Sequence, residues 1–273
     1  MKRVFIMFVL FVIVQTTSSY SDVLVEFKHT DKTNNTVVIS TNSFKGLDMR
    51  KDYFGSNSKA LTTVIYKIVE KLIININHKS RTYNVIDVQK MKTSEDKITE
   101  VIENMNKSLE DAPEEFRNQI QESMKRKLES MEKVDYVDPI IVESGRKMVN
   151  EYSCTIYEIY KRDEKIREYC VAEWSLILGN NEIKKSIEEV GKLIEEINMA
   201  SSIGLGSIAS DVHFENIVRK KISKLSGYPV LINEYSNGYL SSITTFKSSR
   251  VAKHKDAEFN IPMKYTKFNN PMY

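Results

Sequence analysis

The sequence predicts an α+β protein in which runs of short antiparallel strands alternate with helical segments. Three stretches are rich in β-branched and aromatic residues and are divided by short polar breaks, namely 22–88, 138–178 and 228–268. Between them, apolar residues recur at helical spacing in 94–132 and 180–226. A change in hydrophobic period from two to about 3.6 residues separates strands from helices. Because the strands follow one another through short connections, we expect an antiparallel meander.

The first β-rich stretch is expected to supply several consecutive strands. Apolar and polar residues alternate in 22–30, where Val23, Val25 and Phe27 share one face, as in a half-buried strand. Polar breaks at Glu70–Lys71 and 78–81 divide the later part of the stretch into two or three further strands.

Each helical region is expected to contain two helices. In 94–132 the break falls near Pro113, because proline suits the first turn of a new helix. The region 180–226 is divided by a Gly/Ser-rich segment at 201–210. The second of its helices is expected to be capped by Asp211 and to end at Gly227.

The remaining strands are predicted from turn signals and from residue composition. The stretch 138–178 is expected to form three strands, with Gly145 at a turn. Asn237-Gly238 indicates a tight hairpin, because both residues accept positive φ. The segment 256–268 is expected to form a final strand, with Pro262 near its edge or exit.

The N-terminus has the pattern of a secretory signal. Two basic residues, Lys2 and Arg3, precede an apolar run of 11 residues and then a short polar stretch. A membrane-spanning helix needs about 20 apolar residues, so we expect a signal peptide over 1–21, cleaved after Ser21, with cleavage after Ser19 as the alternative. The remaining 22–273 are expected to form one domain without a membrane span. Such a protein would be exported, to the periplasm or outside the cell.

The charge pattern argues against a nucleic-acid partner. Beyond the expected signal, 38 Lys and Arg face 37 Asp and Glu, which is a net charge of about +1. Charges of both signs alternate along the chain, whereas a nucleic-acid groove needs a basic stripe.

The two cysteines are expected to form a structural disulfide. Cys154 and Cys170 flank a segment with Tyr- and Ile-rich arms and a polar centre, which is typical of a hairpin. An even number of cysteines favours pairing in an oxidising compartment. A metal site would need more ligands than two thiols provide, and the spacing is not that of a redox-active C-x-x-C pair.

No catalytic, cofactor-binding or metal-binding motif is found. None of the four histidines belongs to a metal-binding pattern. Gly204–Ala209 matches a dinucleotide fingerprint but follows a helical segment instead of a strand. We therefore expect no enzymatic activity, no cofactor and no metal. A hydrolase would require His213 or His254 to cluster with buried acids.

Several short segments, in this order, carry a resemblance to a known group of proteins. They are GLDMRKDY (46–53), APEEFR (112–117), YSCTIY and EYCVAEW around the cysteines, GYPV (227–230) and FNIPMKY (259–265). With them, nearly all of 22–273 resembles an uncharacterised family of exported bacterial proteins, similar in predicted fold to the LolA/LolB-type lipoprotein carriers. The resemblance implies an incomplete antiparallel β-barrel curled around helices that plug or cover a hydrophobic cavity.

The function implied by the resemblance is the binding of lipid or of the acyl chains of lipoproteins, without covalent chemistry. The expected cavity lining is Val101, Ile102, Met105 and Leu109 from a lid helix, with Trp174 from the sheet. Trp174 suits core packing as well as a pocket wall. The alternative hypothesis is a structural or interaction module of the cell envelope with a filled core and no ligand.

Overall fold

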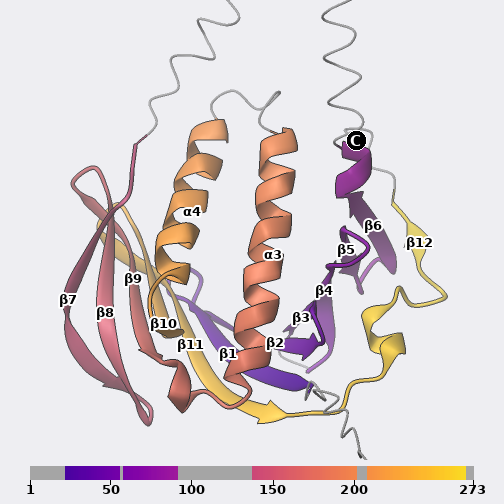
Figure 1. Cartoon of the computed structure of the whole chain (residues 1–273), viewed down its shortest axis with the longest axis horizontal. Coiled ribbons are helices and arrows are strands. Elements are labelled where there is room, and N and C mark those ends of the chain that lie inside the picture. Colours follow the sequence, from indigo (N-terminus) through magenta and orange to yellow (C-terminus); the bar gives the residue numbers. More distant parts are fainter. Residues whose placement is uncertain (1–21, 56–57, 92–136, 202–207, 269–273) are drawn as a thin grey trace, which may run out of the picture.

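A single large sheet forms the scaffold of the protein. The computed structural model describes residues 22–55, 58–91, 137–201 and 208–268, and its arrangement is shown in Figure 1. The strands are β1 (Val23–Asp31), β2 (Thr36–Lys45), β3 (Asp48–Phe54), β4 (Ala60–Lys67), β5 (Leu72–Asn77), β6 (Thr82–Asp87), β7 (Ile140–Val149), β8 (Tyr152–Lys161), β9 (Glu164–Glu173), β10 (Gly227–Ser236), β11 (Tyr239–Val251) and β12 (Thr266–Lys267). The helices include α3 (Asn180–Ser201), α4 (Ile208–Ser223) and the short 3-10 turns η1 (Trp174–Leu176) and η3 (Asp256–Phe259), and residues 88–91 after β6 are also helical.

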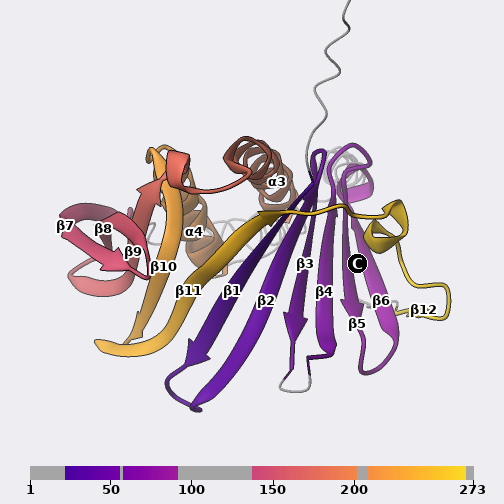
Figure 2. The same cartoon turned by 90° about the horizontal axis from the view of Figure 1, so that it is seen from below.

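The sheet is open and has β12 and β7 at its two edges. The strand order is β12-β6-β5-β4-β3-β2-β1-β11-β10-β9-β8-β7, and it can be followed in Figure 2. Neighbouring strands are antiparallel except for β6 and β12, which are parallel. The predicted α+β class with an unclosed sheet is therefore confirmed, while the expected purely antiparallel pairing is corrected at one edge.

Two consecutive meanders are joined by the pairing of β1 with β11. The residues of β1 lie opposite those of β11 over the whole strand, from Val23 with Val251 to Asp31 with Ser242. Local turns produce the hairpins on either side. At the β10–β11 turn, Asn237 and Gly238 have φ values of 52° and 77°, so the predicted hairpin is confirmed.

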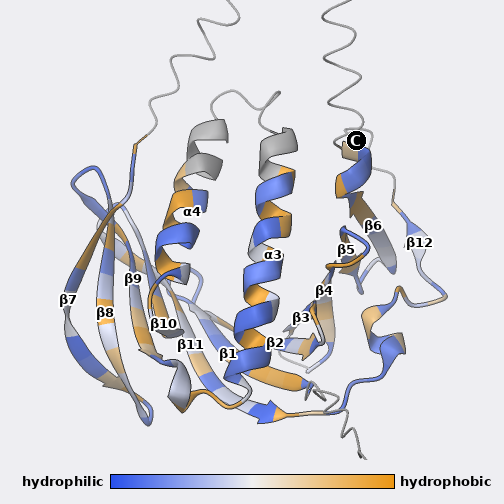
Figure 3. Cartoon of the chain, viewed as in Figure 1, coloured by the Kyte–Doolittle hydropathy of each residue, from blue (hydrophilic) through white to orange (hydrophobic). Residues whose placement is uncertain are grey.

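Helix α3 packs on the inner face of the sheet, which curves around both helices (Figure 1). Ile183 and Val190 are buried in one cluster with Val23, Phe44 and Met49. The two helices alternate hydrophobic and hydrophilic residues along their length (Figure 3). This pattern lets one side of each helix cover the sheet while the other remains polar.

Helix α4 packs on the half of the sheet formed by the second meander. Phe214 and Val218 are buried against Ile159 of β8, and Tyr169 of β9 adds to the same cluster. The helix begins at Ile208 and ends at Ser223, so the expected boundaries at Asp211 and Gly227 were wrong. Phe214 and Val218 pack on the sheet, and tertiary packing contributes more to helix stability in proteins than local signals do.

The C-terminal segment, residues 256–268, covers the face of β4–β6 that points away from α3. Phe259 is buried with Ile65, Ile74 and Ile76, and Ile65 precedes Tyr66, which packs toward α3. Side chains of successive strand residues point to opposite faces. The segment forms η3 and the two-residue strand β12 instead of the expected long strand, because its apolar residues pack on the sheet.

Gly145 and Gly227 both lie in strands, and not at the turn and the helix end expected from the sequence. Gly145 lies within β7 at an irregularity of its pairing with β8, not at the expected turn. Gly227 begins β10, where an added Cβ would collide with the carbonyl oxygen of Ala172 on β9. Glycine at 227 therefore permits the close approach of these two strands.

Candidate binding cavity

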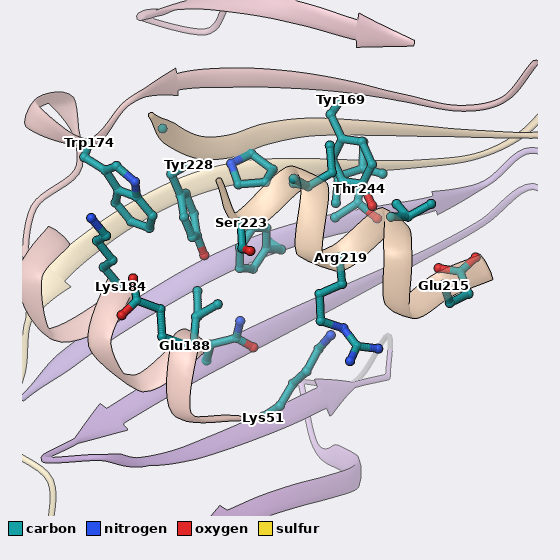
Figure 4. A pocket seen from close by; sticks show the side chains of 18 of the residues that line it. Lys51, Tyr169, Trp174, Lys184, Glu188, Glu215, Arg219, Ser223, Tyr228 and Thr244 are labelled. Atoms are coloured by element: carbon teal, nitrogen blue, oxygen red, sulfur yellow. The ribbon is translucent and has the colours of Figure 1, made fainter. Parts of the chain in front are cut away.

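A cavity of about 350 Å³ lies between the two helices and the inner face of the sheet. Figure 4 shows the side chains that surround it. They come from α3, α4 and six strands, which meet there because the sheet curves, and from η1, which contains Trp174 in place of the expected position on the sheet. Nine of the 19 lining residues are apolar or aromatic, namely Phe27, Tyr169, Trp174, Ile187, Val218, Ile222, Tyr228, Pro229 and Ile232.

Aromatic side chains form the wall on the side of the sheet. The ring of Tyr228 lies 5.2 Å from that of Trp174 and 6.2 Å from that of Phe27, between ring centroids. Behind them Phe246 is fully buried, with its ring 5.7 Å from Tyr228. Burial raises the pKa of the Tyr228 phenol above its ordinary value, so this wall stays uncharged.

Trp174 is both a core residue and a wall residue. It packs against the main hydrophobic cluster and lines the cavity. Its carbonyl oxygen accepts a hydrogen bond of 2.9 Å from Nδ2 of Asn180, which ties η1 to the start of α3. The other expected lining residues, Val101, Ile102, Met105 and Leu109, lie outside the described residues, so their role stays a prediction.

One end of the cavity carries polar groups without partners. Nη1 of Arg219 and Oδ1 of Asn42 are buried and have no hydrogen-bond partner among the described residues, and both side chains line the cavity. Lys51 lines the same space, and in Figure 4 its side chain and that of Arg219 extend toward one another. A buried polar group without a partner costs free energy, so these atoms mark a place for a polar ligand group or water.

The carboxylate of Glu215 forms an ion pair with Arg167. Arg167 donates two hydrogen bonds to Glu215, of 2.9 Å and 3.2 Å, and Nη2 of Arg167 lies 3.4 Å from Glu234. Burial opposes the charged form of Arg167, but Tyr169 and the two glutamates hold its pKa above the ordinary value. The negative charge of Glu215 is thus engaged away from Arg219.

His29 contributes a neutral imidazole to the wall. Its Nδ1 lies 2.8 Å from Oγ1 of Thr244 and its Nε2 lies 2.6 Å from Oγ of Ser40. Burial, followed by the positive charge of Lys51, lowers the pKa of His29 below its ordinary value. Both ring nitrogens form hydrogen bonds with hydroxyl groups. These bonds fix the orientation of the ring, whereas a metal ligand would need one nitrogen for the metal.

A second, more polar hollow of about 460 Å³ adjoins the first. The two share Trp174, Lys184 and Ser223, and the second adds Lys224 and two serines, Ser175 and Ser226. We call the region around the shared Lys184 and Ser223 the polar mouth of the cavity; it lies next to Trp174 of the aromatic wall.

The predicted disulfide is confirmed. Cys154 on β8 and Cys170 on β9 are bonded, with Cα atoms 5.3 Å apart. In the strand register Cys154 lies opposite Ala172 and Cys170 lies opposite Ile156, so the bond runs diagonally across the hairpin. Both cysteines are buried in the main cluster, next to the aromatic wall, where they pack as structural residues.

Other features of the described part of the chain add no second site. No group of three or more His, Cys, Asp or Glu side chains in the described ranges is arranged to hold a metal ion. Within those same ranges, no helix has both the length and the apolar character needed to cross a bilayer. Residues 204–207 of the dinucleotide-like segment lie outside the described residues; the element that precedes the segment in the chain is helix α3 and not a strand, unlike in a βαβ unit.

The polar end of the cavity has no recognisable signal in the sequence. Arg219 precedes Lys220 and Lys221, and a basic run on a helix is commonly a solvated face. Asn42 and Lys51 lie on neighbouring strands and are opposite one another in register. Only the position of α4 over these strands brings the three residues to one space.

Fold and cavity together define an α+β protein in which an open, largely antiparallel sheet and two helices line a partly open cavity with an aromatic wall and a basic end. No family model and no curated protein matches the chain. Among solved structures, the chain is similar to an uncharacterized conserved protein from Thermus thermophilus. The two are 5% identical with a TM-score of 0.44, and the alignment covers 92% of this chain and 91% of the other.

Proposed function

We propose that the protein is an exported, non-enzymatic binding protein that holds an acyl chain of a lipid or lipoprotein in the cavity. The observation that carries the proposal is the aromatic and aliphatic lining of a space of about 350 Å³. Small-molecule sites are concave, mostly apolar and roughly 300–1,000 Å³ in volume, with a few polar groups that fix orientation.

The energetics favour a flexible hydrocarbon chain as the occupant. Each methylene group removed from water contributes about 0.8 kcal/mol, so a chain with ten buried methylenes gains roughly 8 kcal/mol before the costs of binding. A compact polar molecule would leave the walls of Phe27, Tyr228 and Ile232 without apolar contacts.

Export is supported by the disulfide. Cys154 and Cys170 are paired, and disulfides persist mainly in oxidising compartments. A lipid carrier outside the cytoplasm needs an apolar site for its cargo, and the space between α3, α4 and the sheet supports this role.

The only tryptophan of the sequence, Trp174, gives a direct test. A brominated stearate that enters the cavity should quench the fluorescence of Trp174 by contact, saturably, and unlabelled stearate should reverse the effect. Native mass spectrometry of the purified full chain should show co-purifying lipid.

A matched pair of variants locates the bound chain. Ile232→Phe adds bulk to the cavity wall. It should weaken the affinity for brominated stearate, measured by quenching, at least about tenfold, equivalent to ~1.4 kcal/mol. Ile261→Phe adds the same bulk to the cluster on the opposite face of the sheet and should leave binding unchanged. Absence of saturable quenching and of co-purified lipid would reject the proposal.

The alternative, an interaction module of the envelope without a ligand, is favoured by one observation. The edge strand β7 exposes Ile140, Val142 and Met148, at 53%, 43% and 62% of their surface. An apolar edge strand can pair with another chain. This alternative predicts protein crosslinks at β7 and an interior that excludes brominated acyl chains.

A further inference from the structure

We infer that the bound amphiphile carries an anionic head, a carboxylate or a phosphate, which Arg219 and Lys51 hold at the basic end of the cavity. This inference rests on the proposed function, because it assumes that an acyl chain occupies the apolar part. It adds the chemical class of the head group and the residues that recognise it.

The first observation is one unsatisfied nitrogen of the Arg219 guanidinium. Its Nη1 is buried and has no hydrogen-bond partner among the described residues. A guanidinium binds two oxygens of a carboxylate or phosphate at once, through parallel hydrogen bonds. An anionic head would therefore satisfy the donor that the protein leaves open.

The second observation is a second cation in the same space. Lys51 lines the cavity from β3, and its ammonium group lies 4.8 Å above the ring of Tyr53. This contact positions the group without neutralising it, since an aromatic ring carries no net charge. Figure 4 shows Lys51 and Arg219 reaching into the same end of the cavity, away from Trp174.

The carboxylates of the wall do not cancel these charges. Glu215 accepts two hydrogen bonds from Arg167, and Glu188 is exposed on α3, where solvent weakens its field. Arg219 and Lys51 therefore present a net positive field to the interior. Oδ1 of Asn42, also buried without a partner among the described residues, is a hydrogen-bond acceptor and does not bind an anion; it can be satisfied by water or by the hydroxyl of a protonated head.

Three amphiphiles with the same chain length separate the head from the chain: palmitate, hexadecyl phosphate and hexadecanol. Binding to the full chain is measured by competition: each amphiphile displaces brominated stearate from the cavity, and the fluorescence of Trp174 recovers. We expect palmitate or hexadecyl phosphate to bind at least about tenfold more tightly than hexadecanol. Whichever anion binds more tightly identifies the head as carboxylate or phosphate.

Variants on α4 assign this preference to Arg219. Arg219→Gln should remove most of the preference for the anion while leaving hexadecanol binding within about twofold. Lys220→Gln removes the same charge from the next residue, whose partner is Glu195 on α3, and should retain the preference. Lys51→Gln, on a different element, should reduce the preference even if Arg219→Gln fails to fold.

The outcomes distinguish the two proposals. If all three amphiphiles bind equally, or if the preference survives both Arg219→Gln and Lys51→Gln, the head-group inference is wrong and acyl binding stands. Loss of the preference only in Lys184→Gln would place the head at the polar mouth and overturn the inference. If none of the amphiphiles binds, the proposed function itself fails.

Discussion

The imidazole of His78 lies with its Nδ1 2.8 Å from the hydroxyl oxygen of Tyr265, and the two rings meet edge to face with centroids 5.6 Å apart. His78 follows β5, whereas Tyr265 precedes β12 near the end of the described chain. Nε2 of the same imidazole lies 2.8 Å from Oγ1 of Thr63. One histidine thus joins the sheet to the segment that covers its outer face.

A largely buried ion pair on the sheet also contacts the C-terminal segment. Arg50 donates two hydrogen bonds of 2.7 Å to Asp52 and a third to the carbonyl oxygen of Glu258, while Thr63 also donates to Asp52. Asp52 and Thr63 are buried. The C-terminal segment is therefore attached by polar contacts at both Glu258 and Tyr265, in addition to the apolar packing of Phe259.

Tyr265→Phe should loosen the C-terminal segment. Loss of the hydroxyl leaves one nitrogen of His78 without its partner, which we expect to lower the free energy of unfolding by about 1–2 kcal/mol. Urea unfolding measures this change, and faster tryptic cleavage at Lys264 and Lys267 reports local release. Tyr239→Phe, at a side chain that is 79% exposed, is the control, and equal effects of the two variants would contradict the prediction.

Reduction of the disulfide should destabilise the second meander. The bond closes a loop with a sequence separation of 16, and the chain-entropy model assigns about 3 kcal/mol to a loop of this size. We expect dithiothreitol to lower the free energy of urea unfolding of the wild type by that amount. The double variant Cys154→Ala, Cys170→Ala should respond to urea identically with and without the reductant. An unchanged midpoint for the reduced wild type would refute the prediction.

Phe246→Ala should be among the most destabilising single changes. Phe246 is fully buried, and its ring contacts those of Phe27, Tyr152 and Tyr228. Removing a buried phenylalanine ring costs roughly 3–5 kcal/mol, because a cavity remains. Phe268→Ala, at a side chain that is 58% exposed, should cost less than ~0.5 kcal/mol. Thermal and urea unfolding compare the two variants, and similar losses would contradict this assignment of the core.

Stability should fall as the pH is lowered through the range in which unfolded histidine titrates. Burial, then Lys51, lowers the pKa of His29 below 6.5, and burial, then Arg50, does the same for His78. The unfolded chain therefore binds protons at a pH where both folded imidazoles are still neutral, which favours unfolding. We expect a loss of stability below about pH 6.5, and a smaller loss in His29→Gln.

A second measurement isolates His29 from other titrating groups. The NMR titration of its ring protons should give a pKa below 6.5 in the folded protein. A value at or above 6.5 would contradict the neutral state assigned to His29. Binding of an anion beside Lys51 should raise the pKa of His29, because it offsets the lysine charge.

Local patterns predict the hairpins well. The hairpin that carries Cys154 and Cys170, and the turn at Asn237-Gly238, depend on residues close together in sequence. Helix α3 likewise follows from the spacing of Ile183, Ile187 and Val190. In each case one short segment contains the residues that decide its structure.

The predictions that failed concern segments whose structure depends on distant partners. The segment 256–268 contains β-forming residues, but Phe259 packs on Ile65 and Ile76, which stops it from forming a long strand. The start of α4 precedes the expected cap at Asp211, because the helix is placed by packing on β8 and β9.

The sequence alone determined the α+β class, the alternating face of β1, the hairpin at Asn237-Gly238 and the pairing of Cys154 with Cys170. These features arise from periodicity, turn geometry and oxidation of neighbouring thiols, all of which act over short stretches of chain. The tertiary structure alone decided that β1 pairs with β11 and that Arg219 meets Lys51 and Asn42 around one cavity. Contacts between residues so far apart depend on the curvature of the whole sheet and on where α4 packs against it.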